Sequence, residues 1–320
     1  MENKISYGNG IAVKIKDKIV LLDPKVSDFI SFVSHAHFDH SPKEIVRKPF
    51  CTEETYRLIK VRNPYFEANI IKENKKIDFD GFSVKLISSG HILGSTQILI
   101  ETDKGSILYT GDFKLWQGLT HKAIKISQAD ILITEATYGK PSYKFPFVEE
   151  VREEVAEWVF KQLEKGYQVN IGGYTIGKAQ EAIKLLNKNG IVPQVSESIR
   201  KYSEVYNEFD VNLKFLKNGE ESNVFVMPMH TIPYIQNVNS VGCLLTGWAV
   251  SRKYSVEAFP ISDHCDFEQL MIFIQEVRPK KVFCIHGYAK ELAEEIRKKL
   301  KIDARVLGKK QTVLLDFVGY

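Results

Sequence analysis

Three histidines and a carboxylate crowd into one short stretch of this 320-residue chain, Ser34-His35-Ala36-His37-Phe38-Asp39-His40. Neutral imidazole and carboxylate are the ligands that zinc and related ions prefer in proteins. Burying so many polar side chains without partners would cost a large amount of folding free energy. The stretch therefore predicts a metal site.

Other side chains of the same kinds follow short apolar runs elsewhere in the chain. These are His91 after 82–87, Asp112 after 105–110, Glu135 after 129–134, His264 after 255–259 and His286 after 281–285. Short apolar runs between turn residues indicate buried strands, and sites are commonly built where several strand ends converge on one edge of a sheet. Of the eight histidines, only His121 and His230 fall outside these segments, and we expect surface or packing roles for both.

The segments around the metal stretch are predicted to be strands and short helices. Residues 11–15 and 19–22 form a hairpin pattern, and the apolar run 29–33 places the metal stretch at the C-terminal end of a strand. Ser41-Pro42 predicts the start of a short helix, because proline suits the first helical position. Thr52 resembles the N-cap of another helix.

The middle of the chain has a different pattern. Residues 148–165 have the apolar spacing of an amphipathic helix, and the strand at 169–171 leads through a glycine-rich loop, 172–177, into a second helix. Further strands are expected at 224–227 and 241–246. This alternation indicates a small α/β unit inserted between two parts of the metal-binding domain. The glycine loop could hold a phosphate through its N–H groups, and a plain strand-to-helix turn explains it equally well.

Composition excludes little. The chain is 44% hydrophobic and 26% charged, which is ordinary for a globular protein, and its net charge of +4 suits either a polyanionic partner or an unremarkable surface. The four cysteines are scattered without a CxxC pair. We find neither an apolar signal region nor a stretch of membrane-spanning length, and we expect a cytoplasmic protein with no membrane partner.

The motifs resemble a known family. His35-x-His37-x-Asp39-His40, His91 and Asp112 resemble the signature of the metallo-β-lactamase fold. The resemblance continues into the β-CASP branch, which includes RNA 3′-end cleavage factors, ribonuclease J and DNA repair nucleases of the Artemis type. Three residues resemble the acid and histidines of its motifs A, B and C: Glu135 in Glu-Ala-Thr-Tyr-Gly, His264 in Ser-Asp-His-Cys-Asp-Phe and His286 in Ile-His-Gly. Two further segments resemble landmarks of its inserted domain, Gly177-Lys178-Ala179-Gln180-Glu181 and Thr246-Gly247-Trp248.

This resemblance covers nearly the whole chain and implies a fold. It implies an α/β protein, an αββα sandwich of two mixed sheets with helices outside and a small inserted α/β β-CASP domain. Residues 1–140 and 251–320 would form the metallo-β-lactamase domain, and 141–250 would form the cap over the active site. The cap is short for the branch, which suggests a minimal nuclease, such as an RNA-processing factor or a DNA-ligase-associated exonuclease.

The resemblance also implies roles for the site residues. Two zinc ions, with manganese as an alternative, would share a hydroxide that attacks phosphorus. His264 would protonate the leaving oxygen, and Glu135 would orient it. We expect substrate contacts from Lys178, Gly177 and Ser95, and Asp23 is a weaker candidate for a supporting carboxylate. The implied ligands are His35, His37 and His91 for one ion, Asp39, His40 and His286 for the other, and Asp112 as the bridge.

The substrate stays open at this point. The first hypothesis is a zinc-dependent phosphodiesterase acting on single-stranded RNA or DNA, with RNA slightly favoured by the histidine at motif C, His286. The sequence does not decide between exonuclease and endonuclease action or the direction of cleavage. It also leaves open the metal used in the cell and whether the protein is a homodimer. The alternative is a small-molecule hydrolase of the same fold, of the lactonase or thioesterase type. A non-catalytic nucleic-acid-binding relative would be expected to have lost some of these ligands.

Overall fold

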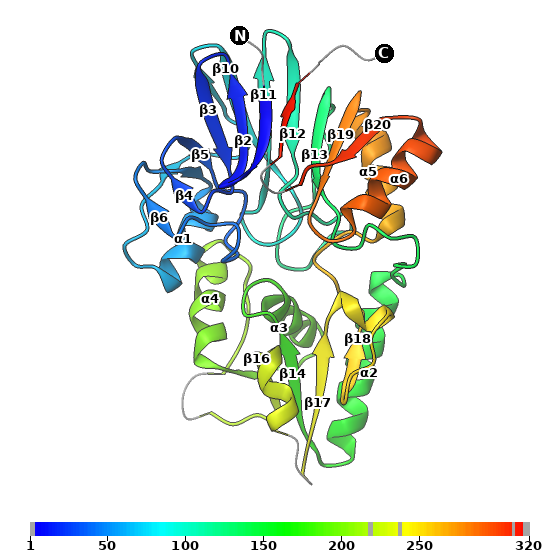
Figure 1. Ribbon diagram of the computed structural model, residues 1–320. Helices are drawn as coiled ribbons and strands as arrows, with labels where there is room; N and C mark the ends of the chain where they lie inside the picture. Colours follow the sequence, from blue (N-terminus) through cyan, green and yellow to red (C-terminus); the bar gives the residue numbers. More distant parts are fainter. Residues whose placement is uncertain (1–3, 217–219, 236–238, 309–310, 316–320) are drawn as a thin grey trace. The chain divides into compact units, whose positions relative to one another are not determined.

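The computed structural model describes residues 4–216, 220–235, 239–308 and 311–315. Two compact units are present (Figure 1). The first unit contains the described residues up to 117, those at 122–142 and those from 264 onward. The second contains 118–121 and the described residues of 143–263. None of the helices that the structure describes is both long and apolar enough to span a lipid bilayer.

The first unit is built on two mixed sheets. The first sheet has the order β21 (Thr312–Leu314), β1 (Lys4–Gly8), β2 (Gly10–Ile15), β3 (Lys18–Leu22), β5 (Ile30–Phe32), β7 (Phe50–Cys51) and β8 (Asn69–Ile70). The second has the order β20 (Asp303–Val306), β19 (Lys281–Ile285), β13 (Ile131–Glu135), β12 (Gly105–Tyr109), β11 (Thr96–Thr102), β10 (Phe82–Ser88) and β9 (Lys76–Phe79). A small ribbon pairs β4 (Val26–Ser27) with β6 (Glu44–Ile45).

Alternation along the strands explains how the layers pack, because successive side chains point to opposite faces of a sheet. In β13, Ile131 and Ile133 join the core that lies between the two sheets. Leu132, between them, packs in a second core with α5 (Phe267–Val277) and α6 (Ala289–Leu300). Each such buried side chain stabilises the fold by about 1.5–3 kcal/mol. The predicted α/β class, with stacked mixed sheets and helices outside, is confirmed.

Strand direction explains why residues far apart in sequence meet. β12, β13 and β19 are parallel neighbours, and β10 runs in the same direction because it is antiparallel to β11, which is antiparallel to β12. The C-terminal ends of these four strands therefore lie at one edge of the sheet. In the first sheet, β3 and β5 are also parallel, so the loops that follow them leave from a common edge.

The second unit is a parallel α/β unit, as its sequence pattern predicts. Its sheet has the order β15 (Gln194–Val195), β16 (Val224–Pro228), β14 (Gln168–Gly173), β17 (Ser240–Leu245) and β18 (Glu257–Phe259). Its helices include α2 (Val148–Glu164), α3 (Lys178–Lys188) and α4 (Glu197–Glu208). β18 pairs with β17, whereas the predicted boundary at residue 250 precedes it. The domain bounds 1–140, 141–250 and 251–320 stay a prediction.

Local signals near the metal stretch have mixed outcomes. The hairpin is confirmed, since β2 and β3 pair antiparallel, and Thr52 caps α1 (Glu53–Arg62) by accepting a hydrogen bond from the Thr55 N–H. The short helix predicted from Ser41 is wrong, because Glu44–Ile45 is the strand β6. The N–H groups of residues 43 and 44 donate to the Lys25 carbonyl, a distant partner that the local proline signal does not reveal.

Candidate metal centre

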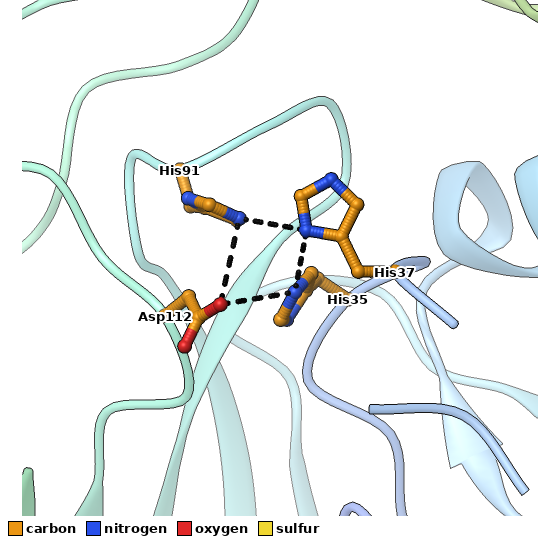
Figure 2. Close-up of side chains that lie close together, drawn as sticks. All are labelled: His35, His37, His91 and Asp112. Atoms are coloured by element: carbon orange, nitrogen blue, oxygen red, sulfur yellow. Dashed lines mark hydrogen bonds and ion pairs between the residues drawn. The ribbon is translucent and has the colours of Figure 1, made fainter. Parts of the chain in front are cut away.

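Four ligand-type side chains from three loops point at one another (Figure 2). His37 Nδ1 lies 3.1 Å from His35 Nε2 and 3.1 Å from His91 Nε2. Asp112 Oδ2 closes the ring at 3.6 Å from His35 Nε2 and 3.8 Å from His91 Nε2. The loops follow β5, β10 and β12, so the sheet edges bring together residues that the sequence separates by up to 77 positions (112 − 35).

A second group lies beside the first, with the His40 ring 4.2 Å from that of His35, centroid to centroid. His40 Nε2 is 3.4 Å from the same Asp112 oxygen and 3.8 Å from Asp39 Oδ2. The ring of His286 lies 6.0 Å from that of His40, centroid to centroid. One carboxylate oxygen therefore faces the Nε2 atoms of three histidines, and the predicted ligands of a second ion gather around one of them.

The glycine after His286 explains how that histidine is presented. His286 itself has a positive φ of 58°, and Gly287 follows with a φ of 43°. A Cβ atom on Gly287 would lie 2.2 Å from the Ala136 carbonyl oxygen, which no side chain could tolerate. Glycine allows the close approach, so the chain can turn at the end of β19 with the imidazole at the sheet edge.

Asp23 is more central than the sequence indicates. Its Oδ1 accepts the Ser34 N–H at 2.6 Å. Its Oδ2 accepts from Ser34 Oγ at 2.6 Å, His40 Nδ1 at 2.7 Å and the Tyr109 hydroxyl at 2.8 Å. Asp23 also has a positive φ of 48°, a conformation that persists for a non-glycine residue only where its surroundings hold it. The roles of Ser34 and Tyr109 had no signal in the sequence.

These hydrogen bonds fix which imidazole nitrogen carries a proton. The single hydrogen of Ser34 Oγ goes to Asp23, so His35 Nδ1, 2.9 Å from that oxygen, is the donor to it. His40 Nδ1 donates to Asp23 in the same way. Since a neutral imidazole carries one N–H, His35 Nε2 exposes a lone pair toward the Asp112 carboxylate, and His40 Nε2 does so once its second proton has been displaced by a metal cation. Acceptors that face acceptors fit a cation held between them.

Spacing and charge agree with that fit. A tetrahedral zinc ion with Zn–N bonds of about 2.0–2.1 Å separates its ligand nitrogens by about 3.3 Å, close to the 3.1 Å seen here. Burial, followed by the other imidazoles, lowers the pKa of His35 well below its usual value, which keeps the ring neutral. Burial would also lower the pKa of His40, but the carboxylates of Asp112, Asp23 and Asp39 raise it to about 10. These carboxylates therefore favour a positive charge at this position, carried by a proton on His40 or by a metal ion that replaces it. The buried His/Asp cluster therefore fits metal binding.

A histidine–glutamate pair adjoins the ring. His264 Nδ1 lies 2.8 Å from Glu135 Oε1, and the His264 ring is 4.9 Å from that of His91. Glu135 is buried and also accepts hydrogen bonds from the Phe113 N–H and from the N–H and hydroxyl of Thr137. Burial would raise the pKa of Glu135, but the His264 imidazole and these hydrogen bonds lower it. The carboxylate therefore stays ionised and orients the imidazole.

Two braces hold the loops that carry the histidines, and the sequence revealed neither. The Arg62 guanidinium, from the end of α1, donates to the Ala36 carbonyl at 2.6 Å and to the Ser41 hydroxyl. Ser95 Oγ accepts the N–H groups of His91 and of residue 92, both at 3.1 Å. Ser95 is itself buried, so its hydroxyl supports the His91 loop.

The predicted substrate contacts in the second unit already have partners. The ammonium of Lys178 is buried and lies 2.6 Å from Asp263 Oδ2. The N–H of Gly177, which could have faced a phosphate, donates to Gln180 Oε1 at 2.8 Å. The substrate-binding roles of Lys178, Gly177 and Ser95 stay predictions. His121 and His230 also lie in the second unit, outside the cluster.

Comparisons with known proteins agree with the fold and the motifs. A family model described as the Zn-dependent metallo-hydrolase RNA specificity domain (RMMBL) matches residues 249–307. A "Probable DNA ligase" of Opitutus terrae is 29% identical over 84% of this chain, and an "RNase J-like protein" of Methanocaldococcus jannaschii is 30% identical over 53% of it. The chain spans only 28% and 46% of the lengths of these relatives.

A solved structure supports the fold across the whole chain. A protein of unknown function from Enterococcus faecalis V583 superposes with a TM-score of 0.72, covering 98% of this chain and 100% of that one. At 15% identity this likeness concerns the fold alone. The motifs at the sheet edges and the matches in sequence together confirm the resemblance of this chain to the β-CASP branch of the metallo-β-lactamase-fold nucleases.

Proposed function

We propose that this protein is a metal-dependent phosphodiesterase that cleaves nucleic acid. One observation carries the proposal: Asp112 Oδ2 faces imidazole nitrogens of two ligand groups at 3.4–3.8 Å. A carboxylate between two donor groups suits a bridge between two ions, an arrangement used in phosphatases and nucleases. The match to a metallo-hydrolase RNA specificity domain and the "RNase J-like" name of one relative support nucleic acid as the substrate.

The ligand assignment follows the two groups. We assign His35, His37 and His91 to one ion, His40, Asp39 and His286 to the other, and Asp112 to both. Zinc is favoured by the imidazole-rich donor set, and manganese is the alternative. When bound, such ions lower the pKa of water and stabilise charge on phosphoryl oxygens. Asp23 and Ser34 keep the tautomers of His35 and His40 that present Nε2 to the ions.

The His264–Glu135 pair supplies the proton. With its Nδ1 held by Glu135, His264 has its Nε2 on the opposite side of the ring. An imidazolium stabilised by an ionised glutamate can hold a proton at Nε2 and release it to the leaving oxygen of the phosphodiester. Glu135 acts through His264, because it is buried and fully engaged by the backbone and Thr137. The same geometry also admits His264 as a ligand beside Asp112, which a metal measurement separates.

The substrate is proposed to be single-stranded RNA or DNA, with RNA slightly favoured. The lean toward RNA rests on the histidine at position 286 and on the RNA specificity domain that matches residues 249–307. A homodimer and a cytoplasmic location stay predictions. The direction of cleavage also stays open, since a 5′ exonuclease needs a pocket for the terminal phosphate.

A cleavage assay tests the proposal. Matched single-stranded RNA and DNA, each labelled at one end and carrying a 5′ phosphate or a 5′ hydroxyl, are incubated with zinc- or manganese-loaded protein. We expect cleavage of at least one polymer; mononucleotides from the 5′ end would define an exonuclease and internal fragments an endonuclease. Asp112→Asn, run in parallel, excludes a contaminating nuclease. No cleavage of either polymer by metal-loaded protein contradicts the proposal and favours a lactonase or thioesterase.

A further inference from the structure

The metal stretch also carries an exposed aromatic side chain. Phe38 lies between His37 and Asp39, and 62% of its surface is exposed. Phenylalanine gains about 1.5–3 kcal/mol from full burial, so this ring contributes little to the stability of the fold. Its neighbours in the chain are both assigned to ions, which puts the ring at the rim of the metal centre.

The backbone holds this ring in a fixed outward position. The His40 N–H donates to the His37 carbonyl at 3.2 Å, which closes a tight turn with Phe38 and Asp39 at its two central positions. Ser41 Oγ donates to the same carbonyl at 3.2 Å, and Arg62 braces both Ser41 and the Ala36 carbonyl. The outer residues of the turn point into the cluster and Asp39 Oδ2 stays 3.8 Å from His40 Nε2, while the Phe38 ring is exposed.

A cation accompanies the ring. Lys43 Nζ lies 4.9 Å from the centre of the Phe38 ring, a cation–π arrangement. The backbone N–H of Lys43 donates to the Lys25 carbonyl at 2.9 Å, which fixes the base of the Lys43 side chain next to the backbone of a second exposed lysine. An aromatic ring beside lysines is the combination with which proteins bind single-stranded nucleic acid, the ring stacking on a base and the cation contacting the backbone phosphate.

We propose that Phe38 is a stacking platform for the nucleobase next to the cleaved phosphate and that Lys43 contacts the adjacent backbone phosphate. The inference rests on the proposed function, and it adds a subsite on the metal stretch itself. A phosphodiester held by the ions lies beside the ligands His37 and Asp39, so the base of the same nucleotide comes within reach of the residue between them. Stacking tolerates any base, so this subsite would favour single strands without reading their sequence.

The test is a double-mutant cycle between protein and substrate. Dissociation constants and single-turnover rates are measured with an oligonucleotide that the wild type cleaves, and with the same oligonucleotide made abasic beside the cleaved phosphate. We expect Phe38→Ala to weaken binding of the intact strand about tenfold to a hundredfold. The abasic strand should bind wild type and Phe38→Ala equally, because the interaction is already lost. Phe38→Trp should bind at least as tightly as wild type.

Matched variants control for indirect effects. Tyr65→Ala removes another ring of the same unit, 91% exposed and not assigned to an ion, and should leave both constants unchanged. Lys43→Gln should weaken binding and reduce the slope of log Kd against log salt by about one ion. Phe38→Ala should keep the metal content of the wild type.

The outcomes separate the inference from the proposed function. If Phe38→Ala weakens binding of the intact and abasic strands by the same factor, or changes neither, the stacking platform is wrong while the nuclease stands. If metal-loaded wild type neither binds nor cleaves any oligonucleotide, the proposed function fails and this subsite fails with it.

Discussion

The metal centre of the first unit and the ion pairs of the second unit both contain buried carboxylates, but different groups face these carboxylates. In the second unit each buried carboxylate faces a cation: Lys178 meets Asp263 and Arg152 meets Glu181, both at 2.6 Å. In the first unit, the Nε2 atoms of His35 and His40 face the Asp112 carboxylate, and that of His35 carries a lone pair. A buried polar cluster is complete in the first arrangement, whereas the second is complete only with a cation.

The comparison separates function from stability. Glu181 also accepts the Leu119 N–H and the Thr120 hydroxyl, so it fastens the short segment 118–121 to α3. The Glu181 carboxylate is neutralised by Arg152 and accepts these hydrogen bonds, so it needs no metal ion or other ligand. Burial and polarity alone therefore do not identify a site; the arrangement of donors and acceptors does. Substitutions in the two regions should accordingly have different readouts.

The largest effect is expected from Asp112→Asn. The amide keeps the shape of the side chain but not its charge, and it would place N–H groups against the ions or leave them one anionic ligand short. Cleavage should fall by about a thousandfold or more, since such ions supply several kcal/mol of transition-state stabilisation. Kinetics and metal content measured together check this, with the exposed Asp103→Asn as the control. Full turnover by a variant with both ions bound would contradict the shared-carboxylate account.

His264→Ala should slow cleavage by about 10²–10⁴-fold, the usual contribution of general acid catalysis, without changing the metal content. Cleavage should slow because Glu135 engages Nδ1 of His264, so the proton for the leaving oxygen comes from Nε2, which the alanine lacks. The exposed His230→Ala, in the second unit, serves as the matched control. Loss of an ion in His264→Ala would make this residue a ligand.

Lys178→Met tests the opposite region. It leaves the buried Asp263 carboxylate without its ammonium, so we expect unfolding free energy to fall by about 3–5 kcal/mol. Metal content should stay unchanged. Chemical denaturation measures the loss, and Lys188→Met, exposed on the same helix, should change stability by less than about 0.5 kcal/mol. A stable Lys178→Met protein that binds oligonucleotide poorly would instead support the substrate contact that the sequence suggests.

The smallest effect is expected from Asp23→Asn. An amide accepts fewer hydrogen bonds than the carboxylate that now serves Ser34, His40 and Tyr109, so the tautomers would be less well defined. Metal affinity should fall about 10- to 100-fold, as measured by competition with a chelator. The exposed Asp28→Asn is the control. Unchanged affinity would mean that Asp23 serves only the fold.

Sequence reasoning succeeded where the signal was local. The spacing of His35, His37 and His40 and the strand-end positions of His91 and Asp112 were enough to predict a cluster, because parallel strands bring their ends to one edge. The capping residue Thr52 was equally readable, since it acts within three residues on its own helix.

Predictions from the sequence were wrong or incomplete where contacts between residues far apart in the chain determine the local structure. Asp23 draws donors from positions 11, 17 and 86 residues away, and no spacing rule links them. The helix expected from Ser41 gave way to a strand because residues 43 and 44 bond to Lys25. Lys178, which follows the glycine loop, was expected to contact substrate, whereas its ammonium pairs with Asp263, 85 residues away. Each outcome depends on packing that a single sequence does not display.

The most direct test of the central claim is anomalous diffraction at the zinc edge from crystals of zinc-loaded protein. The account predicts two peaks in the first unit, one among His35, His37 and His91, the other beside His40, with the Asp112 carboxylate between them. A single peak, or a peak held by Glu135 and His264, would contradict the bridging role of Asp112 on which the proposed mechanism depends.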